Sequence, residues 1–155
     1  MRLFIFIFAV FCATGLRADQ PSDQEIAQLE SCVSYSSDAP LARNVELCRD
    51  ITFQACIGNT TQTTLAIENC MDRTHKAYDV LLNKWWAPMK ANAQAKGTWD
   101  QLLGRQRQWI KDRDAACEAA YRSSGGGASR NIDYLNCMIT RTAERATEFY
   151  YTLYN

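Results

Sequence analysis

The chain is 155 residues long, and a chain of this length has room for one domain. Hydrophobic residues make up 47% of it and charged residues 22%, which is typical of a globular protein. Lys and Arg together number 17, as do Asp and Glu, so the chain lacks the basic excess that nucleic-acid binding needs. Its single histidine, His75, argues against a zinc enzyme and is expected at the surface of a helix.

The N-terminal segment has the composition of a secretory signal peptide. A short positive start, Met1-Arg2, precedes an apolar run from Leu3 to Ala13, and the small residue Ala18 follows. The apolar run has the length of a signal-peptide core and is too short to span a bilayer as a helix. We therefore expect a signal peptide over residues 1–18 and a single domain over residues 19–155 with no stable membrane anchor. The alternative is a buried N-terminal helix.

Cleavage would place the mature chain in the periplasm or outside the cell, and the cysteines agree with this prediction. Cys12 would leave with the signal peptide, so that an even number of cysteines remains. An oxidising compartment favours disulfides over free thiols, and no CxxC motif suggests a redox dithiol or a zinc site. The cysteines expected to form disulfides are Cys32, Cys48, Cys56, Cys70, Cys117 and Cys137.

Helical periodicity covers most of the remaining chain, and no alternating apolar and polar run marks a strand. Ser22-Asp23-Gln24-Glu25 is a capping box that opens a first helix, and residues 36–40 break it. A second helix is predicted from about residue 42 to residue 57, followed by a turn at Gly58.

Three further helices follow, and the first of them has the longest apolar stripe, from Ile67 to Met89. Pro88 has no backbone N–H to donate, so it should kink or end this helix. Thr98-Trp99-Asp100-Gln101 is a second capping box and opens a fourth helix, which the serines and glycines of residues 123–127 end. A last helix starts near Asn131. The predicted fold is an all-α, disulfide-stapled bundle of about five helices.

The helix order also predicts how the cysteines pair. Antiparallel helices joined by a short loop bring the end of one helix beside the start of the next. The last pair is the better determined, because only two cysteines follow Cys70, whereas the four earlier cysteines could exchange partners. The favoured pairing is sequential: Cys32–Cys48, Cys56–Cys70 and Cys117–Cys137.

A set of fixed spacings runs through the C-terminal half of the chain. In order, its elements are Leu82-Asn83, then Gln106-x-x-Trp109-x-x-x-Arg113-Asp114-x-x-Cys117, then a glycine cluster, then Cys137-x-x-Thr140-x-x-x-x-Arg145. This order resembles that of the LprI-like lysozyme-inhibitor N-terminal domain family, most closely from Tyr78 to Leu153. The resemblance implies a small exported bacterial helical domain, and lysozyme inhibition, the activity from which the family takes its name.

The motif residues of the fourth helix, including Trp109 and Arg113, are spaced so that they share one face. A guanidinium on such a mostly apolar face must be paired or reach water. Asp114 points about 100° away from Arg113, so we expect the partner to be Glu144, Glu148 or a carbonyl at a helix end. Two interpretations stay open: a buried network that fixes helix register, or a binding surface that includes Trp109 and Arg113.

Trp86 is a further candidate for partner binding. Trp85 continues the apolar stripe, so its neighbour Trp86 should lie at the edge of the bundle or outside it. It is either an aromatic residue that fills a groove near Pro88 or an anchor that contacts a partner.

The glycine-rich loop before the last helix is the most plausible protruding site. Its glycines, Gly125, Gly126 and Gly127, cost backbone entropy unless the chain bends sharply or approaches another molecule closely. The alternative is a simple turn. We hypothesise that a nearby disulfide pins the loop and that it presents Ser129 and Arg130 to a partner. A lysozyme cleft holds two carboxylates, which an arginine on a rigid loop could pair.

These features predict a protein that acts by binding rather than by catalysis. No GxSxG, HExxH, P-loop or paired-histidine pattern is present, and we expect no cofactor and no metal. The favoured function is that of an exported lysozyme-inhibitor-like protein whose partner is a lysozyme or another envelope protein. The alternative is a non-inhibitory envelope module for an unknown ligand. A near-neutral charge gives little electrostatic steering toward lysozymes, many of which are strongly basic.

Overall fold

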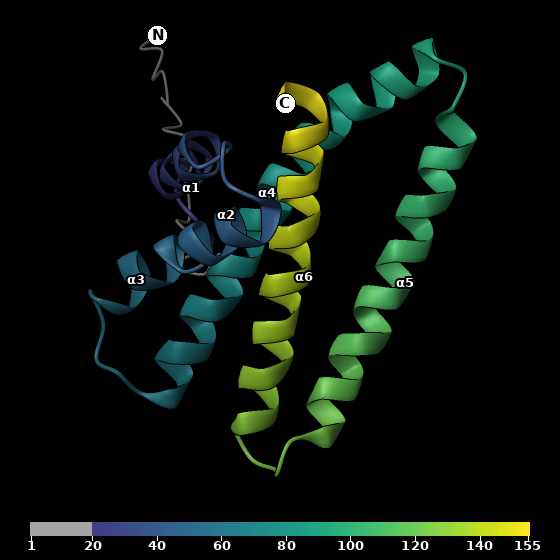
Figure 1. The fold of residues 1–155 in the computed structure, drawn as a ribbon. Coiled ribbons are helices and arrows are strands. Elements are labelled where there is room, and N and C mark those ends of the chain that lie inside the picture. The colour runs from purple at the N-terminus through teal and green to yellow at the C-terminus, as the bar shows by residue number, and fades with distance from the viewer. Residues whose placement is uncertain (1–19) are drawn as a thin grey trace, which may run out of the picture.

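A computed structural model describes residues 20–155, and within this range the chain folds into helices with no strands (Figure 1). The predicted all-α class is therefore confirmed. The signal peptide predicted over residues 1–18 lies outside the described residues. The helices are α1 (Asp23–Tyr35), α2 (Leu41–Cys48), α3 (Ile51–Ile57), α4 (Thr64–Ala95), α5 (Trp99–Ser123) and α6 (Ser129–Tyr154).

The start of α1 is the capping box that the sequence predicts. The backbone N–H of Glu25 donates to the Ser22 hydroxyl at 3.3 Å, and the Glu25 carboxylate accepts from the Ser22 backbone N–H at 2.7 Å. Both bonds satisfy donors at a helix start that would otherwise lack a partner.

The single helix predicted over residues 42–57 is wrong, because α2 and α3 are separated at Arg49 and Asp50. The Arg49 guanidinium pairs with Asp50 at 3.1 Å and donates to the Asn136 side-chain oxygen of α6 at 2.8 Å. The break lets α2 pack on α6 while α3 packs on α4. A straight helix could not follow both partners, so tertiary packing overrides the local helical pattern.

Pro88 does not end α4, which continues to Ala95. The missing backbone donor costs one helical hydrogen bond. The turns beyond it are anchored by the buried Ala93 and by Met89, which packs against the core. Gly97, with φ of +68°, then redirects the chain, and Figure 1 shows the end of α4 leaning over toward the start of α5.

The boundaries of α5 and α6 are close to those predicted, but the second capping box does not form. Thr98 precedes α5, yet its side chain makes no capping bond and instead donates to the Ala93 carbonyl at 3.5 Å. The backbone explains this, because Thr98 has ψ of 15°, far from the extended conformation that a capping residue adopts.

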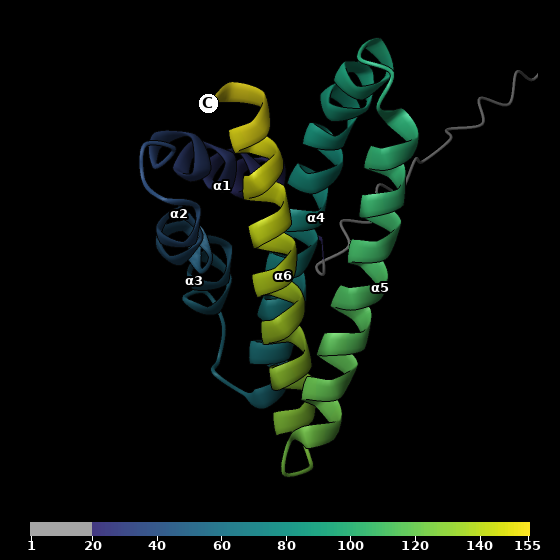
Figure 2. The same cartoon turned by 45° about the vertical axis from the view of Figure 1, so that its right-hand side comes forward.

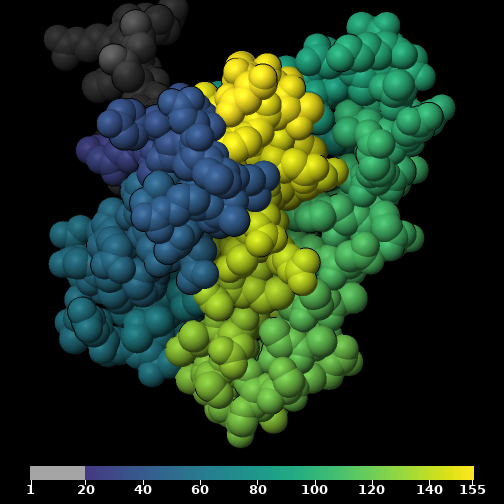
Figure 3. Space-filling view, in the orientation of Figure 1, coloured from purple at the N-terminus to yellow at the C-terminus, as the bar shows by residue number. Residues whose placement is uncertain are grey.

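The core lies where α4 packs against α6. Its largest fully buried side chains are Trp85 and Tyr78 of α4 and Phe149 of α6. Figure 2 shows α4 and α6 side by side in the middle, with α1–α3 on one side and α5 on the other. In the space-filling view α6 fills the centre of the face between these two groups (Figure 3). Within the described residues, no helix is both long and apolar enough to cross a membrane.

The predicted sequential pairing of the cysteines is confirmed. Each bridge links neighbouring elements and closes a short loop, which the chain-entropy model credits with roughly 3 kcal/mol of stability. The pairs, with their Cα–Cα distances, are Cys32–Cys48 at 5.7 Å, Cys56–Cys70 at 5.5 Å and Cys117–Cys137 at 5.3 Å.

The Cys117–Cys137 bridge matters most for the stability of α5, because only Leu102 and Cys117 of this helix are buried. Replacing both cysteines of this bridge by serine should lower the free energy of unfolding by about 3 kcal/mol and raise amide hydrogen exchange along α5. Urea denaturation and hydrogen-exchange mass spectrometry measure the two effects. The matched control replaces Cys56 and Cys70, which should raise exchange near α3 and leave α5 protected. Unchanged exchange in α5 after loss of Cys117–Cys137 would contradict this prediction.

Candidate functional site

The structure places the predicted partner-binding residues in two separate groups. Trp86, Trp109 and Arg113 are all half-buried and lie where α4, α5 and α6 meet. The three glycines, with Ser129 and Arg130, lie at the far end of the α5–α6 hairpin.

The motif residues of α5 share one face, as predicted from their spacing, and the structure shows that this face contacts α6. The Gln106 side-chain oxygen accepts from the Arg145 Nε of α6 at 3.0 Å. Two guanidinium groups lie over the Trp109 ring, that of Arg113 at 5.0 Å and that of Arg145 at 5.8 Å from its centroid. Arg113 belongs to α5 itself, so of these two cation–π contacts it is that of Arg145 that links α6 to α5, where few apolar side chains are buried.

The predicted partner of Arg113 is wrong. Arg113 pairs with Asp114, its neighbour in sequence, with its terminal nitrogen 2.8 Å from the carboxylate. Glu148 is instead engaged by Arg145 at 2.7 Å, and Glu144 is exposed. The arginine side chain is long enough for its guanidinium to reach the Asp114 carboxylate and also lie over the Trp109 ring, so the angle between the two Cα–Cβ bonds did not decide the pairing.

Trp86 lies at the edge of the bundle, half-buried, as predicted. Its ring stacks on Phe149 of α6 at 5.6 Å and meets Trp99 of α5 at 5.8 Å. The Arg145 guanidinium lies over the Phe149 ring, 4.6 Å from its centroid. Arg145 belongs to the sequence motif but was not predicted as a site residue. Its spacing of four residues from Phe149 on the same helix could have indicated this contact.

The α5–α6 hairpin ends in a short glycine turn. Gly126 and Gly127 have φ of +113° and +62°, conformations that side chains with a Cβ rarely adopt. The Ser129 hydroxyl donates to the Gly126 carbonyl at 2.6 Å, and the Ser124 hydroxyl bonds to the Asp133 carboxylate. Gly125 is exposed and has no positive φ. The turn is therefore held by its own hydrogen bonds on both sides.

Arg130 stands exposed beside this turn. Its guanidinium lies 5.8 Å from the ring centroid of Tyr121, a residue of α5 that sequence reasoning did not single out. The next residue, Asn131, donates to the Glu68 carboxylate of α4 at 3.2 Å. Figure 1 shows the turn at the projecting end of the hairpin, beyond the other helices. We name residues 124–130 the hairpin tip.

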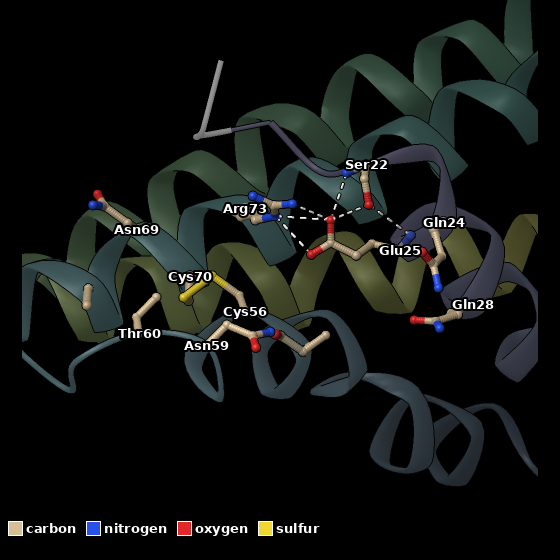
Figure 4. Close-up of a pocket in the computed structure, with 12 residues that line it drawn as sticks. Ser22, Gln24, Glu25, Gln28, Cys56, Asn59, Thr60, Asn69, Cys70 and Arg73 are labelled. Carbon is tan, nitrogen blue, oxygen red and sulfur yellow. Dashed lines mark hydrogen bonds and ion pairs between the residues drawn. A yellow bond between two sulfur atoms is a disulfide. The ribbon is translucent and has the colours of Figure 1, made fainter. Parts of the chain in front are cut away.

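A polar cavity of about 640 Å³ lies between α1, α3 and α4 (Figure 4). Arg73 of α4 donates from its Nε to the Glu25 carboxylate of α1 at 2.9 Å, and its terminal nitrogen makes a second, shorter contact. The Cys56–Cys70 disulfide lies beside this pair, as Figure 4 shows. Most of the other lining residues carry amide or hydroxyl side chains, and two are alanines: Ser22, Gln24, Gln28, Asn59, Thr60, Asn69, Ala55 and Ala66.

The Glu25–Arg73 pair joins α1 to α4. Burial by itself would raise the pKa of Glu25. The hydrogen bonds from Arg73 and Ser22, together with the Arg73 charge, outweigh burial and hold the pKa of Glu25 below its usual value. A carboxylate that stays ionised and engaged in this way stabilises the fold and is poorly suited to acid–base chemistry.

His75 is not a surface residue, contrary to the prediction. It is half-buried on α4, and its Nε2 atom is buried without a hydrogen-bond partner. Burial lowers the pKa of His75, and the Arg113 charge lowers it further, while Asp79 and Asp72 raise it. Over residues 20–155, the structure contains no cluster of His, Cys, Asp or Glu that could hold a metal ion.

The lowered pKa of Glu25 makes its contribution to stability dependent on pH. The ionised carboxylate stabilises the fold above the unfolded-state value of 4.5, and this stabilisation is lost as the pH falls through the folded-state pKa. Glu25→Gln should therefore cost about 1–2 kcal/mol of unfolding free energy at neutral pH, and the difference should shrink below pH 4.5. Urea denaturation across this pH range measures it.

The control for this variant is Glu46→Gln. The Glu46 carboxylate pairs with Arg43 on the surface, with its side chain 69% exposed, so its removal should leave stability nearly unchanged at every pH. If the unfolding free energy of Glu25→Gln falls with pH as steeply as that of the parent protein, the Glu25–Arg73 pair is not the source of the effect.

Comparison with known proteins agrees with this arrangement. The family model described as lysozyme inhibitor LprI matches residues 56–149, which include α4, α5 and most of α6. No curated protein and no solved structure gives a significant match. The match covers more than half of the chain and includes the Gln106–Cys117 motif, so the chain belongs to the LprI lysozyme-inhibitor family.

Proposed function

We propose that the protein is exported and inhibits a lysozyme by inserting the hairpin tip into the cleft of that enzyme. The observation that carries this proposal is the placement of the exposed Arg130 on a projecting turn that a disulfide and local hydrogen bonds hold rigid. The three disulfides fit an oxidising compartment, which supports export.

The chemistry of a lysozyme cleft complements this tip. Two carboxylates carry out glycoside hydrolysis, and the cleft is shaped to admit a chain of sugars. A guanidinium can donate two parallel hydrogen bonds to one carboxylate. Arg130 could therefore neutralise a catalytic acid while the glycine turn, which has little side-chain bulk, enters the narrow part of the cleft.

Rigidity adds to the expected affinity. A flexible loop loses conformational entropy when it binds, whereas a loop fixed beforehand does not. The Cys117–Cys137 bridge lies within the hairpin near the tip, and Asn131 ties the first turn of α6 to α4. Much of the conformational entropy of the hairpin tip is therefore lost when the protein folds and is not lost again on binding.

The motif residues between the helices hold the hairpin in place, and the proposal assigns contact with the partner to the hairpin tip. The side chains of Arg113 and Arg145 are only 14% and 12% exposed, and each already faces an acidic partner. Trp86 packs against the Phe149 ring of α6, and the Arg145 guanidinium of α6 lies over Trp109. A direct role of Trp86, Trp109 or Arg113 in partner binding stays a prediction.

A second candidate function is that of a non-inhibitory envelope module that uses the same rigid tip on another protein. The observation that favours it is charge: removal of residues 1–18 would leave a formal net charge of only −2, because Arg2 and Arg17 are lost. Weak net charge gives little long-range attraction to a strongly basic lysozyme.

Arg130→Ala should weaken inhibition of a sensitive lysozyme by about 10-fold to 100-fold, because a charge pair in the interface is lost. A turbidity assay of bacterial cell-wall lysis measures the inhibition. The control is Arg122→Ala, which removes an exposed arginine from the same end of the hairpin. Inhibition that survives both Arg130→Ala and replacement of the glycines would contradict insertion of the tip.

The shape of the turn can be tested separately from its charge. Gly126→Ala places a Cβ on a residue with φ of +113°, so it should cost about 1–2 kcal/mol and distort the tip, weakening inhibition. Gly104→Ala is the control, because Gly104 lies in the interior of α5 with open space around it. That change should stabilise the protein by about 0.5–1 kcal/mol and leave inhibition intact. Equal inhibition by both variants would show that the turn conformation is unimportant.

A further inference from the structure

A second concave surface lies at the opposite end of α6 from the hairpin tip. It is a groove of about 430 Å³ between α1 and the last turns of α6, and Trp85 of α4 forms part of its lining. Figure 2 shows α1 crossing behind the C-terminal part of α6 at this place. The other lining residues on which the argument depends are Glu30, Ser31, Ser34, Tyr150 and Tyr154.

Two tyrosine rings form an aromatic side of this groove. Tyr150 meets Trp85 edge-on at 5.2 Å, and its hydroxyl donates to the Ser34 hydroxyl at 2.9 Å. These contacts fix the ring from both ends. Tyr154 packs against Tyr150 at 4.8 Å between ring centroids and keeps 60% of its surface exposed. The groove therefore offers an accessible aromatic ring on a fixed base.

The α1 side of the groove supplies polar groups. Ser31 and Ser34 carry hydroxyls, which can both donate and accept, and Glu30 carries a carboxylate, which accepts. The Glu30 carboxylate is held by the Lys84 ammonium, with nitrogen–oxygen distances of 2.6 Å and 2.7 Å. This ion pair fixes the carboxylate in place and leaves the rim with little net charge.

We propose that this groove binds a neutral oligosaccharide. A pyranose ring has an apolar face of C–H groups that packs on an aromatic ring, and a rim of hydroxyls that needs both donors and acceptors. Tyr154 and Tyr150 provide the aromatic side, while Ser31, Ser34 and Glu30 provide the polar side. The volume falls within the range of small-ligand sites, roughly 300–1,000 Å³.

Charge decides between neutral and anionic ligands. A sugar acid or a phosphate placed on the rim would face the carboxylate of Glu30, and the nearby cation, Lys84, is already paired with it. A ligand without charge meets no such repulsion. This site is separate from Arg130 and does not depend on the proposed inhibition of lysozyme.

Isothermal titration calorimetry with maltotriose and triacetylchitotriose tests the proposal on the purified protein. At least one of these neutral sugars should bind saturably, and Tyr154→Ala should weaken binding by about tenfold through loss of the stacking ring. Tyr154→Phe should keep most of the affinity. Trigalacturonic acid, which carries carboxylates, should bind several-fold more weakly than the neutral sugar.

The matched control is Tyr35→Ala, which removes a tyrosine that is 91% exposed near the end of α1 and does not line the groove. It should leave sugar binding unchanged, and circular dichroism should show that both alanine variants are folded. The proposal would be overturned if no neutral sugar binds saturably, if Tyr154→Ala binds the sugar as tightly as the parent protein, or if the acidic sugar binds more tightly than the neutral one. Lysozyme inhibition by Tyr154→Ala should match that of the parent protein, so the two proposals can fail independently.

Discussion

The packing of α4 against α6 is the interaction on which the rest of the structure depends. Trp85, Tyr78 and Phe149 are almost completely removed from solvent where these two helices meet, and burial of such large rings supplies much of the favourable free energy of folding. The helices α1, α2 and α3 cover one side of this pair, and α5 lies along the other (Figure 2). Each peripheral helix needs further links because its own apolar surface is small.

Those links are covalent and ionic as well as apolar. The Cys32–Cys48 and Cys56–Cys70 bridges join the short helices to their neighbours, and the Glu25–Arg73 pair fixes α1 on α4. On the other side, α5 depends on the Cys117–Cys137 bridge and on Arg145 of α6, which contacts Trp109 and Gln106. A small domain with a limited core gains stability from such staples at little cost in chain length.

The same links create rigid surfaces at the two ends of α6. At one end, the hairpin tip carries Arg130 on a fixed glycine turn. At the other end, the groove between α1 and the last turns of α6 carries Tyr154, which packs on the ring of Tyr150. In both proposals the residues that would contact a partner are already held in place, which lowers the entropy cost of binding. The first is the basis of the proposed lysozyme inhibition, and the second is the basis of the proposed saccharide site.

The sequence by itself determined the helical class, most helix boundaries, the Cys117–Cys137 pair and which residues of α5 share a face, because these follow from local periodicity and loop length, and it favoured the other two disulfides without excluding an exchange of partners. Only the tertiary structure decided the break at Asp50, the continuation of α4 past Pro88, the Asp114 partner of Arg113 and the stacking of Trp86 on Phe149. These features depend on which helices meet and at what register. Helical spacing shows which side chains share a face, but not which helix that face will contact.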